Sequence, residues 1–124
     1  MEFAWVWAGP YAGMLLAQLG AEVIKVEGHN RTDLMRRVVV WPLSESKPSS
    51  IPSSEGLSFN AVNMNKKSVT LDLSKPEGLK IAKKLAATSD IVFDNMRPGA
   101  LGKLGLGHEN LRELKEDIIV ASAS

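Results

Sequence analysis

The chain has 124 residues, the size of one domain, and we expect residues 1–124 to fold as a single unit. Its 15 Lys and Arg residues nearly balance 14 Asp and Glu residues, and the net charge of +1 gives no electrostatic basis for binding nucleic acid or an anionic membrane surface. The absence of cysteine excludes disulfides, a Cys-based zinc site and a thiol nucleophile, and the widely separated His29 and His108 predict no metal site.

Two further features concern the location of the protein. The longest apolar run, at residues 14–19, is much shorter than the roughly 20 residues that a membrane span needs. The N-terminus has no basic region ahead of its apolar stretch, which argues against a secretory signal. We therefore expect a cytoplasmic protein with no membrane partner.

The first 27 residues predict a strand, a helix and a second strand. Residues 3–7 are aromatic or β-branched around one alanine and are typical of a buried strand. Pro10 is suited to be the first residue of a helix, the residues up to Leu19 are nearly all apolar, and Gly20 is a plausible end. Residues 22–27 then alternate as a second strand, which completes a βαβ unit.

Residues 28–56 are expected to form a long loop. Charged residues give way to WPLSESKPSSIPSSEG, which holds three prolines and six serines and has no periodicity. A loop of this length inside a compact domain is uncommon and tends to be functional, and the basic Arg31, Arg36 and Arg37 favour a function as well.

The remainder of the chain continues to alternate helices and strands. Its pattern predicts a short helix at 57–63, a strand at 68–73, a helix from Pro76, a strand at 90–94, a short helix at 100–104, a helix at 109–116 and a strand at 118–122. Such alternation produces a parallel sheet with right-handed crossovers. We predict an α/β fold with a Rossmann-like open parallel sheet and helices on both faces.

In an open parallel sheet, ligands bind outside the carboxyl ends of the strands, where the strand order reverses. The residues that follow the predicted strands there are Trp7 and Ala8, Gly28, Ser74, and 95–97. An indole and small residues could form a slot for a flat base, while Arg97 and Lys103 could meet phosphates. Because Trp5 and Trp7 alternate along the first strand, at most one of them is expected to face a ligand.

The first strand, turn and helix imitate a dinucleotide-binding motif, with Glu27 as the acidic residue that ends the second strand. The glycines of that motif are absent, however, and Pro10 removes one of the backbone amides that would approach a pyrophosphate. NAD-type binding is therefore not predicted. No Ser-His-Asp or paired-carboxylate arrangement can be assigned to one site either.

Four segments together resemble the family III coenzyme A (CoA) transferases, the CaiB/BaiF family, which also includes the α-methylacyl-CoA racemases. They are WAGPYAGMLLAQLGAEVIKVE, NMNKKSVTLDLSKPEG, SDIVFDNMRPGALGKLGLG and DIIVASAS. Each is weak alone, but in this order and spacing they cover nearly the whole chain outside the 28–56 loop and are highly specific.

The resemblance implies that the chain is the N-terminal, CoA-binding part of the family III fold. It places CoA or acyl-CoA against Trp7, Ala8, Leu71, Asp72, Leu73, Asn95, Met96, Arg97 and Lys103. Gly28 departs from the pattern, since related transferases often have a basic residue there, and Arg31 could substitute for it. Known members form interlocked dimers, so the expected partner is a second copy or a complementary subunit.

The reaction that the resemblance implies is transfer of CoA from an acyl-CoA donor to a carboxylic acid. The family's catalytic Asp, which carries the acyl group as a mixed anhydride, lies beyond the match to Ser124, as do the racemase-type acid and base. We therefore assign no catalytic residue and expect no turnover from this chain alone. Three functions stay open: the CoA-binding portion of a transferase, a fragment of an α-methylacyl-CoA racemase, and a non-catalytic CoA-binding or interaction module.

Overall fold

The structure, a computed structural model, describes residues 1–36 and 57–123. Its strands are β1 (Ile24–Glu27), β2 (Lys67–Thr70), β3 (Ile91–Asp94) and β4 (Ile119–Ser122). β1 pairs with β2 and β3 pairs with β4, in both cases in parallel. The expected parallel sheet is therefore present.

The N-terminal segment, residues 1–3, joins the two strand pairs. Glu2 forms parallel bridges to Lys25 of β1 and to Phe93 of β3. Ladder hydrogen bonds run on both sides, from the Glu2 N–H to the Ile24 carbonyl and from the Phe3 N–H to the Phe93 carbonyl, each at 2.8 Å. The order across the sheet is therefore β2, β1, the N-terminal segment, β3 and β4, and the order reverses at the N-terminal segment.

The first strand was predicted at residues 3–7 and is wrong in its bounds. The ladder ends at Phe3, and α1 (Ala8–Gln18) begins after a turn in which Val6 has a φ of 72°. The strand propensity of the aromatic and β-branched residues is overridden, because the backbone of the turn is bound by side chains from other segments. α1 begins at Ala8, two residues before the start predicted at Pro10, and Pro10 lies in the first helical turn, where N–H groups have no intrahelical partner.

The end of α1 follows the prediction made from Gly20. Gly20 has a φ of 102°, its N–H donates to the Ala17 carbonyl, and the Ala21 N–H donates to the Leu16 carbonyl. This pair of bonds is the Schellman motif, which requires a left-handed residue that glycine adopts without steric cost.

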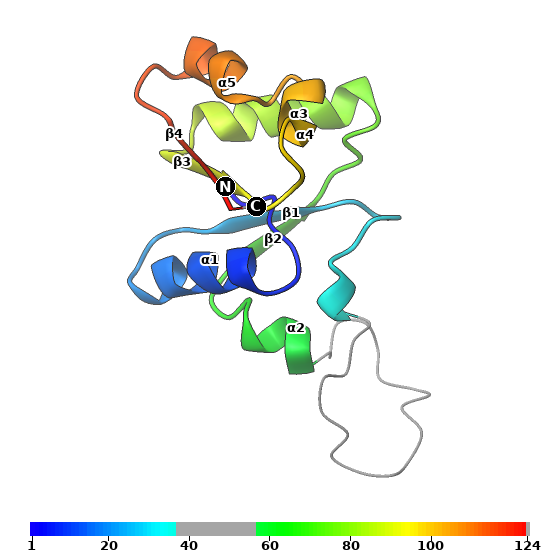
Figure 1. The fold of residues 1–124 in the computed structure, drawn as a ribbon, viewed down its shortest axis with the longest axis vertical. Coiled ribbons are helices and arrows are strands. Elements are labelled where there is room, and N and C mark those ends of the chain that lie inside the picture. The colour runs from blue at the N-terminus through cyan, green and yellow to red at the C-terminus, as the bar shows by residue number, and fades with distance from the viewer. Residues whose placement is uncertain (37–56, 124) are drawn as a thin grey trace.

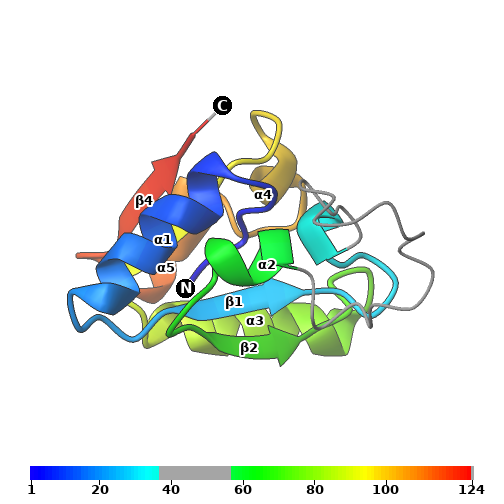
Figure 2. The same cartoon turned by 90° about the horizontal axis from the view of Figure 1, so that it is seen from below.

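Helices cover both faces of the sheet, as predicted (Figure 1). α1 and α2 (Leu57–Ala61) lie on one face, and α3 (Pro76–Ala87), α4 (Ala100–Lys103) and α5 (His108–Leu114) lie on the other. Figure 2 shows α1 and α2 in front of the sheet. Within the predicted 28–56 loop, Leu34–Arg36 forms a short 3₁₀ helix, and the part of that prediction at residues 37–56 lies outside the described residues.

The apolar core lies between the sheet and the layer of α3, α4 and α5. Its buried members are Met1, Phe3, Val26, Leu71, Ala82, Ala86, Val92, Leu101, Leu106, Leu111 and Ile118. Each large side chain buried in this way contributes about 1.5–3 kcal/mol. Because side chains alternate along extended segments, Glu2 and Lys25 are turned away from this core, and both are buried on the side of α1.

None of the described helices is long and apolar enough to cross a membrane.

Candidate functional site

A pocket of about 710 Å³ opens at the carboxyl ends of the strands. We call it the strand-end pocket. Its lining comes from four segments that lie far apart in the sequence: Phe3 and Trp5; Val26, Glu27, Gly28, His29, Asn30 and Arg31; Leu71, Asp72, Leu73 and Ser74; and Met96, Arg97, Pro98, Ala100, Lys103 and Leu104. The pocket therefore lies where the strand order reverses, which is the location that the parallel-sheet rule selects.

The strand-end pocket brings together six of the nine residues predicted to contact CoA. These six are Leu71, Asp72, Leu73, Met96, Arg97 and Lys103. Trp7, Ala8 and Asn95 lie outside the lining: Trp7 is 51% exposed and caps the start of α1, and the side chain of Asn95 binds the backbone of Trp5. Whether any of the nine contacts CoA stays a prediction.

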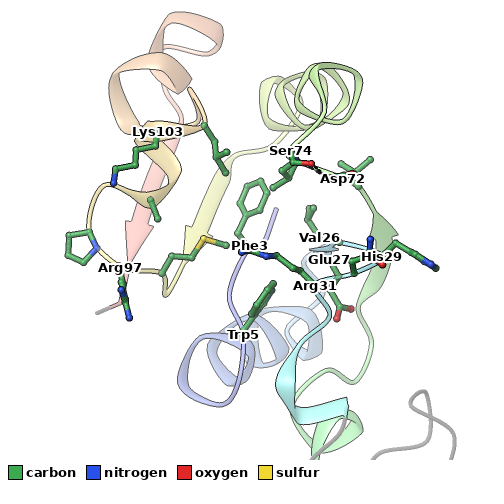
Figure 3. Close-up of a pocket in the computed structure, with 18 residues that line it drawn as sticks. Phe3, Trp5, Val26, Glu27, His29, Arg31, Asp72, Ser74, Arg97 and Lys103 are labelled. Carbon is green, nitrogen blue, oxygen red and sulfur yellow. Dashed lines mark hydrogen bonds between the residues drawn. The ribbon is translucent and has the colours of Figure 1, made fainter.

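Trp5 and Arg31 line the pocket but were not among the nine residues predicted to contact CoA. Trp5 forms part of the wall, whereas the prediction selected Trp7 on the assumption of an extended strand. Arg31 also lines the pocket, and in Figure 3 its side chain extends toward the region between Phe3 and Trp5. The departure at Gly28 was the signal for Arg31, whereas the alternation of Trp5 and Trp7 could only show that one of the two indoles would face a ligand.

Basic residues line the pocket on opposite sides. Arg97 and Lys103 come from the β3–α4 side, and His29 and Arg31 come from the segment after β1 (Figure 3). All four residues are exposed, and the two arginines and the lysine are cations. They are available to bind anionic groups such as phosphates.

The two carboxylates in the lining are already engaged. Glu27 is buried and accepts hydrogen bonds from Arg36 Nε at 2.9 Å, from Arg36 Nη2 at 2.6 Å and from the Asp33 N–H at 2.8 Å. Burial opposes its ionisation, but these hydrogen bonds and the Arg36 charge outweigh burial and lower the pKa of Glu27. Its charge is therefore neutralised within the fold.

Asp72 is exposed at the turn after β2. Its Oδ1 accepts hydrogen bonds from Ser74 Oγ at 2.6 Å and from the Ser74 N–H at 3.0 Å. These bonds lower the pKa of Asp72, so it is an anion at neutral pH. Asp72 therefore stabilises the turn through Ser74 and forms no ion pair with Arg31, Arg97 or Lys103.

The floor of the strand-end pocket is apolar. Phe3, Val26 and Leu71 are buried members of the core, and Leu73, Met96 and Leu104 pack against them. An apolar floor with a few polar groups at the rim is typical of a small-molecule site, and the volume lies within the usual range of about 300–1,000 Å³. The site is suited to a ligand that combines an apolar or flat part with anionic groups.

A second, smaller hollow of about 290 Å³ lies at the opposite edge of the sheet, next to the amino ends of the strands. Glu22 and Asp90 line it, so it lacks the cationic rim of the strand-end pocket. Within residues 1–36 and 57–123, no group of three or more His, Cys, Asp or Glu side chains is placed to hold a metal ion.

Comparison with known proteins shows the family of the chain. The sequence model of CoA-transferase family III matches residues 1–124. The chain belongs to CoA-transferase family III. This family III chain is 39% identical over 126 residues to an acyl-CoA transferase of Fusarium pseudograminearum and 39% identical over 127 residues to a succinate–glutarate CoA-transferase of Agrobacterium fabrum.

Solved structures show the same relationship. A CaiB/BaiF family protein from Brucella suis superimposes with a TM-score of 0.80 at 34% identity, and the alignment covers 98% of the family III chain and 30% of that protein. The two relatives named above are covered over 27% and 30% of their lengths, with 100% and 98% of this chain aligned. The family III chain therefore spans about 30% of the length of its relatives and corresponds to an N-terminal portion of them.

Proposed function

We propose that the strand-end pocket binds CoA or acyl-CoA, and that the chain is the Rossmann-like, CoA-binding N-terminal portion of a family III CoA-transferase. The whole enzyme would move CoA from an acyl-CoA donor to a carboxylic acid acceptor. The observation that carries the proposal is the meeting of an apolar floor with exposed cations from two segments, Arg31 on one side and Arg97 with Lys103 on the other. CoA offers the matching chemistry, because it combines a flat purine and a long uncharged pantetheine arm with several phosphates.

The residues of the pocket would divide this work by their chemistry. Arg31, Arg97 and Lys103 would bind phosphate oxygens, with the planar guanidinium groups able to form paired hydrogen bonds. Phe3, Met96 and Leu73 would contact the base or the pantetheine arm by apolar packing. Neither role requires a group that changes protonation near neutral pH.

We propose that the chain alone does not catalyse transfer. Family III transfer needs a carboxylate that is free to attack the thioester. In the described lining of the strand-end pocket, Glu27 is held by Arg36 and Asp72 is held by Ser74. A fragment of an α-methylacyl-CoA racemase would have the same pocket and would also lack a free carboxylate there. If the chain acts by itself, the alternative is a non-catalytic CoA-binding module.

We also propose that the chain associates with a second protein chain through α1. α1 exposes Tyr11, Leu15 and Leu16, and the residue after it, Leu19, is 86% exposed. Large apolar side chains grouped on one helix favour burial against protein. A second copy or a complementary subunit is the proposed partner, and sedimentation of the pure chain would test it: a monomer at all concentrations would contradict association with itself.

Calorimetric titration with CoA tests the binding proposal. We expect saturable binding, and we expect Lys103→Ala to weaken it about tenfold, or about 1.4 kcal/mol, through loss of a charge-assisted contact. Lys80→Ala is the matched control, because Lys80 is an exposed lysine of α3 outside the pocket. No binding at millimolar CoA, or an equal loss in both variants, would contradict the proposal.

A further inference from the structure

Asn95 binds the backbone of Trp5 from a distance of 90 residues in the sequence. Its Oδ1 accepts a hydrogen bond from the Trp5 N–H at 2.8 Å, and its Nδ2 donates to the Trp5 carbonyl at 2.7 Å. One planar amide thus satisfies both polar groups of one residue, as a neighbouring strand would do. Only a side chain with one donor and one acceptor side by side can make this pair of bonds.

The same turn is held from its other side by charged residues. Lys25 Nζ donates to the Ala4 carbonyl at 2.7 Å, and the Val6 N–H donates to Asp33 Oδ1 at 3.0 Å. Val6 has a φ of 72°, a left-handed conformation that is a genuine outlier for a β-branched residue. Such a conformation persists only where the surroundings impose it.

α1 packs closely against the clamped turn. A Cβ atom added to Gly9 would overlap Ala4 Cβ and would lie 3.2 Å from Asn95 Cγ. At Gly9 the helix backbone therefore lies directly against Ala4 and the Asn95 side chain.

The conformation of this turn decides which indole enters the pocket wall. Trp5 is half-buried and lines the strand-end pocket, whereas Trp7 is exposed outside it. We propose that Asn95 is a positioning residue, whose amide fixes the Trp5 backbone so that the indole forms the pocket wall next to Arg31 (Figure 3). This inference rests on the proposed CoA site, and it gives Asn95 an indirect role in place of the direct contact that the family resemblance implies.

A double-mutant cycle separates the two roles. We expect Asn95→Ala to weaken CoA binding about tenfold in the wild-type background and to have almost no effect in a Trp5→Ala background, because the positioned group is then gone. Asn95→Asp, which keeps the acceptor for the Trp5 N–H and loses the donor, should give a smaller loss. An undiminished loss in the Trp5→Ala background would show direct contact with the ligand and would overturn the proposal, and so would no loss in the wild-type background.

A ligand-free measurement distinguishes failure of this inference from failure of the proposed function. The indole N–H signal of Trp5, assigned in the ¹H–¹⁵N spectrum by its loss in Trp5→Ala, should shift or broaden in Asn95→Ala or Asn95→Asp, while the Trp7 signal stays in place. If the wild-type chain binds no CoA, the proposed function fails and this spectrum still decides the positioning of Trp5. An unchanged Trp5 signal in a folded variant would overturn it.

Discussion

At the scale of single residues, Glu2, Lys25, Asp33 and Lys66 form a buried charge cluster. Lys25 Nζ lies 3.2 Å from Glu2 Oε1 and 2.9 Å from Asp33 Oδ2, and Lys66 Nζ lies 2.8 Å from Glu2 Oε2. All four side chains are at most 2% exposed. The cluster joins the N-terminal segment, β1, the residue before the 3₁₀ helix and the residue before β2.

Lys66 and Lys67 are adjacent in the sequence, but we expect their substitution to lower stability by very different amounts. Lys66 Nζ also donates to the Pro10 carbonyl at 2.7 Å and to Asn63 Oδ1 at 2.9 Å, so Lys66→Met leaves buried acceptors without a donor. We expect a loss of about 3–5 kcal/mol in the free energy of unfolding, measured by urea titration. Lys67→Met removes only an exposed ion pair with Glu22 and should cost less than about 1 kcal/mol. Equal losses would contradict the assigned role of the cluster.

Glu27 gives a prediction for pH. Its pKa is lowered in the folded chain by Arg36 and the Asp33 N–H, despite its burial, so its stabilisation is present above the unfolded value of about 4.3 and is lost as the pH falls through the lower folded pKa. The difference in unfolding free energy between wild type and Glu27→Gln should therefore be larger at pH 7 than at pH 3. A difference that does not change with pH would show that the ionised carboxylate does not provide the stabilisation.

At the scale of elements, α1 depends on close packing that its local sequence does not reveal. A Cβ atom added to Gly13 would overlap Glu2 Oε2 and lie 3.2 Å from Lys66 Nζ, whereas one added to Gly102 of α4 would meet nothing within 4 Å. Glycine inside a helix is unfavourable because of its backbone freedom, but at Gly13 the helix must approach the charge cluster directly.

Two glycine-to-alanine substitutions test this difference. Helix propensity alone would make each of them stabilising by up to about 1 kcal/mol. We expect Gly102→Ala to follow propensity and Gly13→Ala to lower the melting temperature, because the added methyl displaces a buried carboxylate. A stabilising Gly13→Ala would mean that α1 is not packed against Glu2 as described.

The sequence predicted the ends of helices correctly where a residue at that end determines them. Gly20 ends α1 through its own left-handed backbone, and Pro76 begins α3 at its first position. The strand predicted at residues 3–7 failed because its end is set by Asn95 and Asp33, which bind the turn from distant parts of the chain. Such long-range bonds leave no trace in local propensity.

At the scale of the whole molecule, the alternation of strands and helices was enough to predict the parallel sheet and the edge at which the strand-end pocket opens. The same rule selected Ser74, Met96 and Arg97, and the family resemblance implied Leu71–Leu73; all of these residues line that pocket. The sequence alone could not show that Trp5, and not Trp7, lines the pocket, because the turn contains the left-handed Val6. Nor could it show that Arg36 neutralises Glu27.

If the strand-end pocket holds CoA, the ¹H–¹⁵N shift changes during a CoA titration should map to the pocket lining. We predict saturable changes at Arg31, Leu73, Arg97 and Lys103, which reach the pocket from three separate segments. The smaller hollow at the amino ends of the strands is an internal control, and Ile24 and Ser89 in its lining should not change. Changes confined to that hollow, or no saturable change anywhere, would contradict the account.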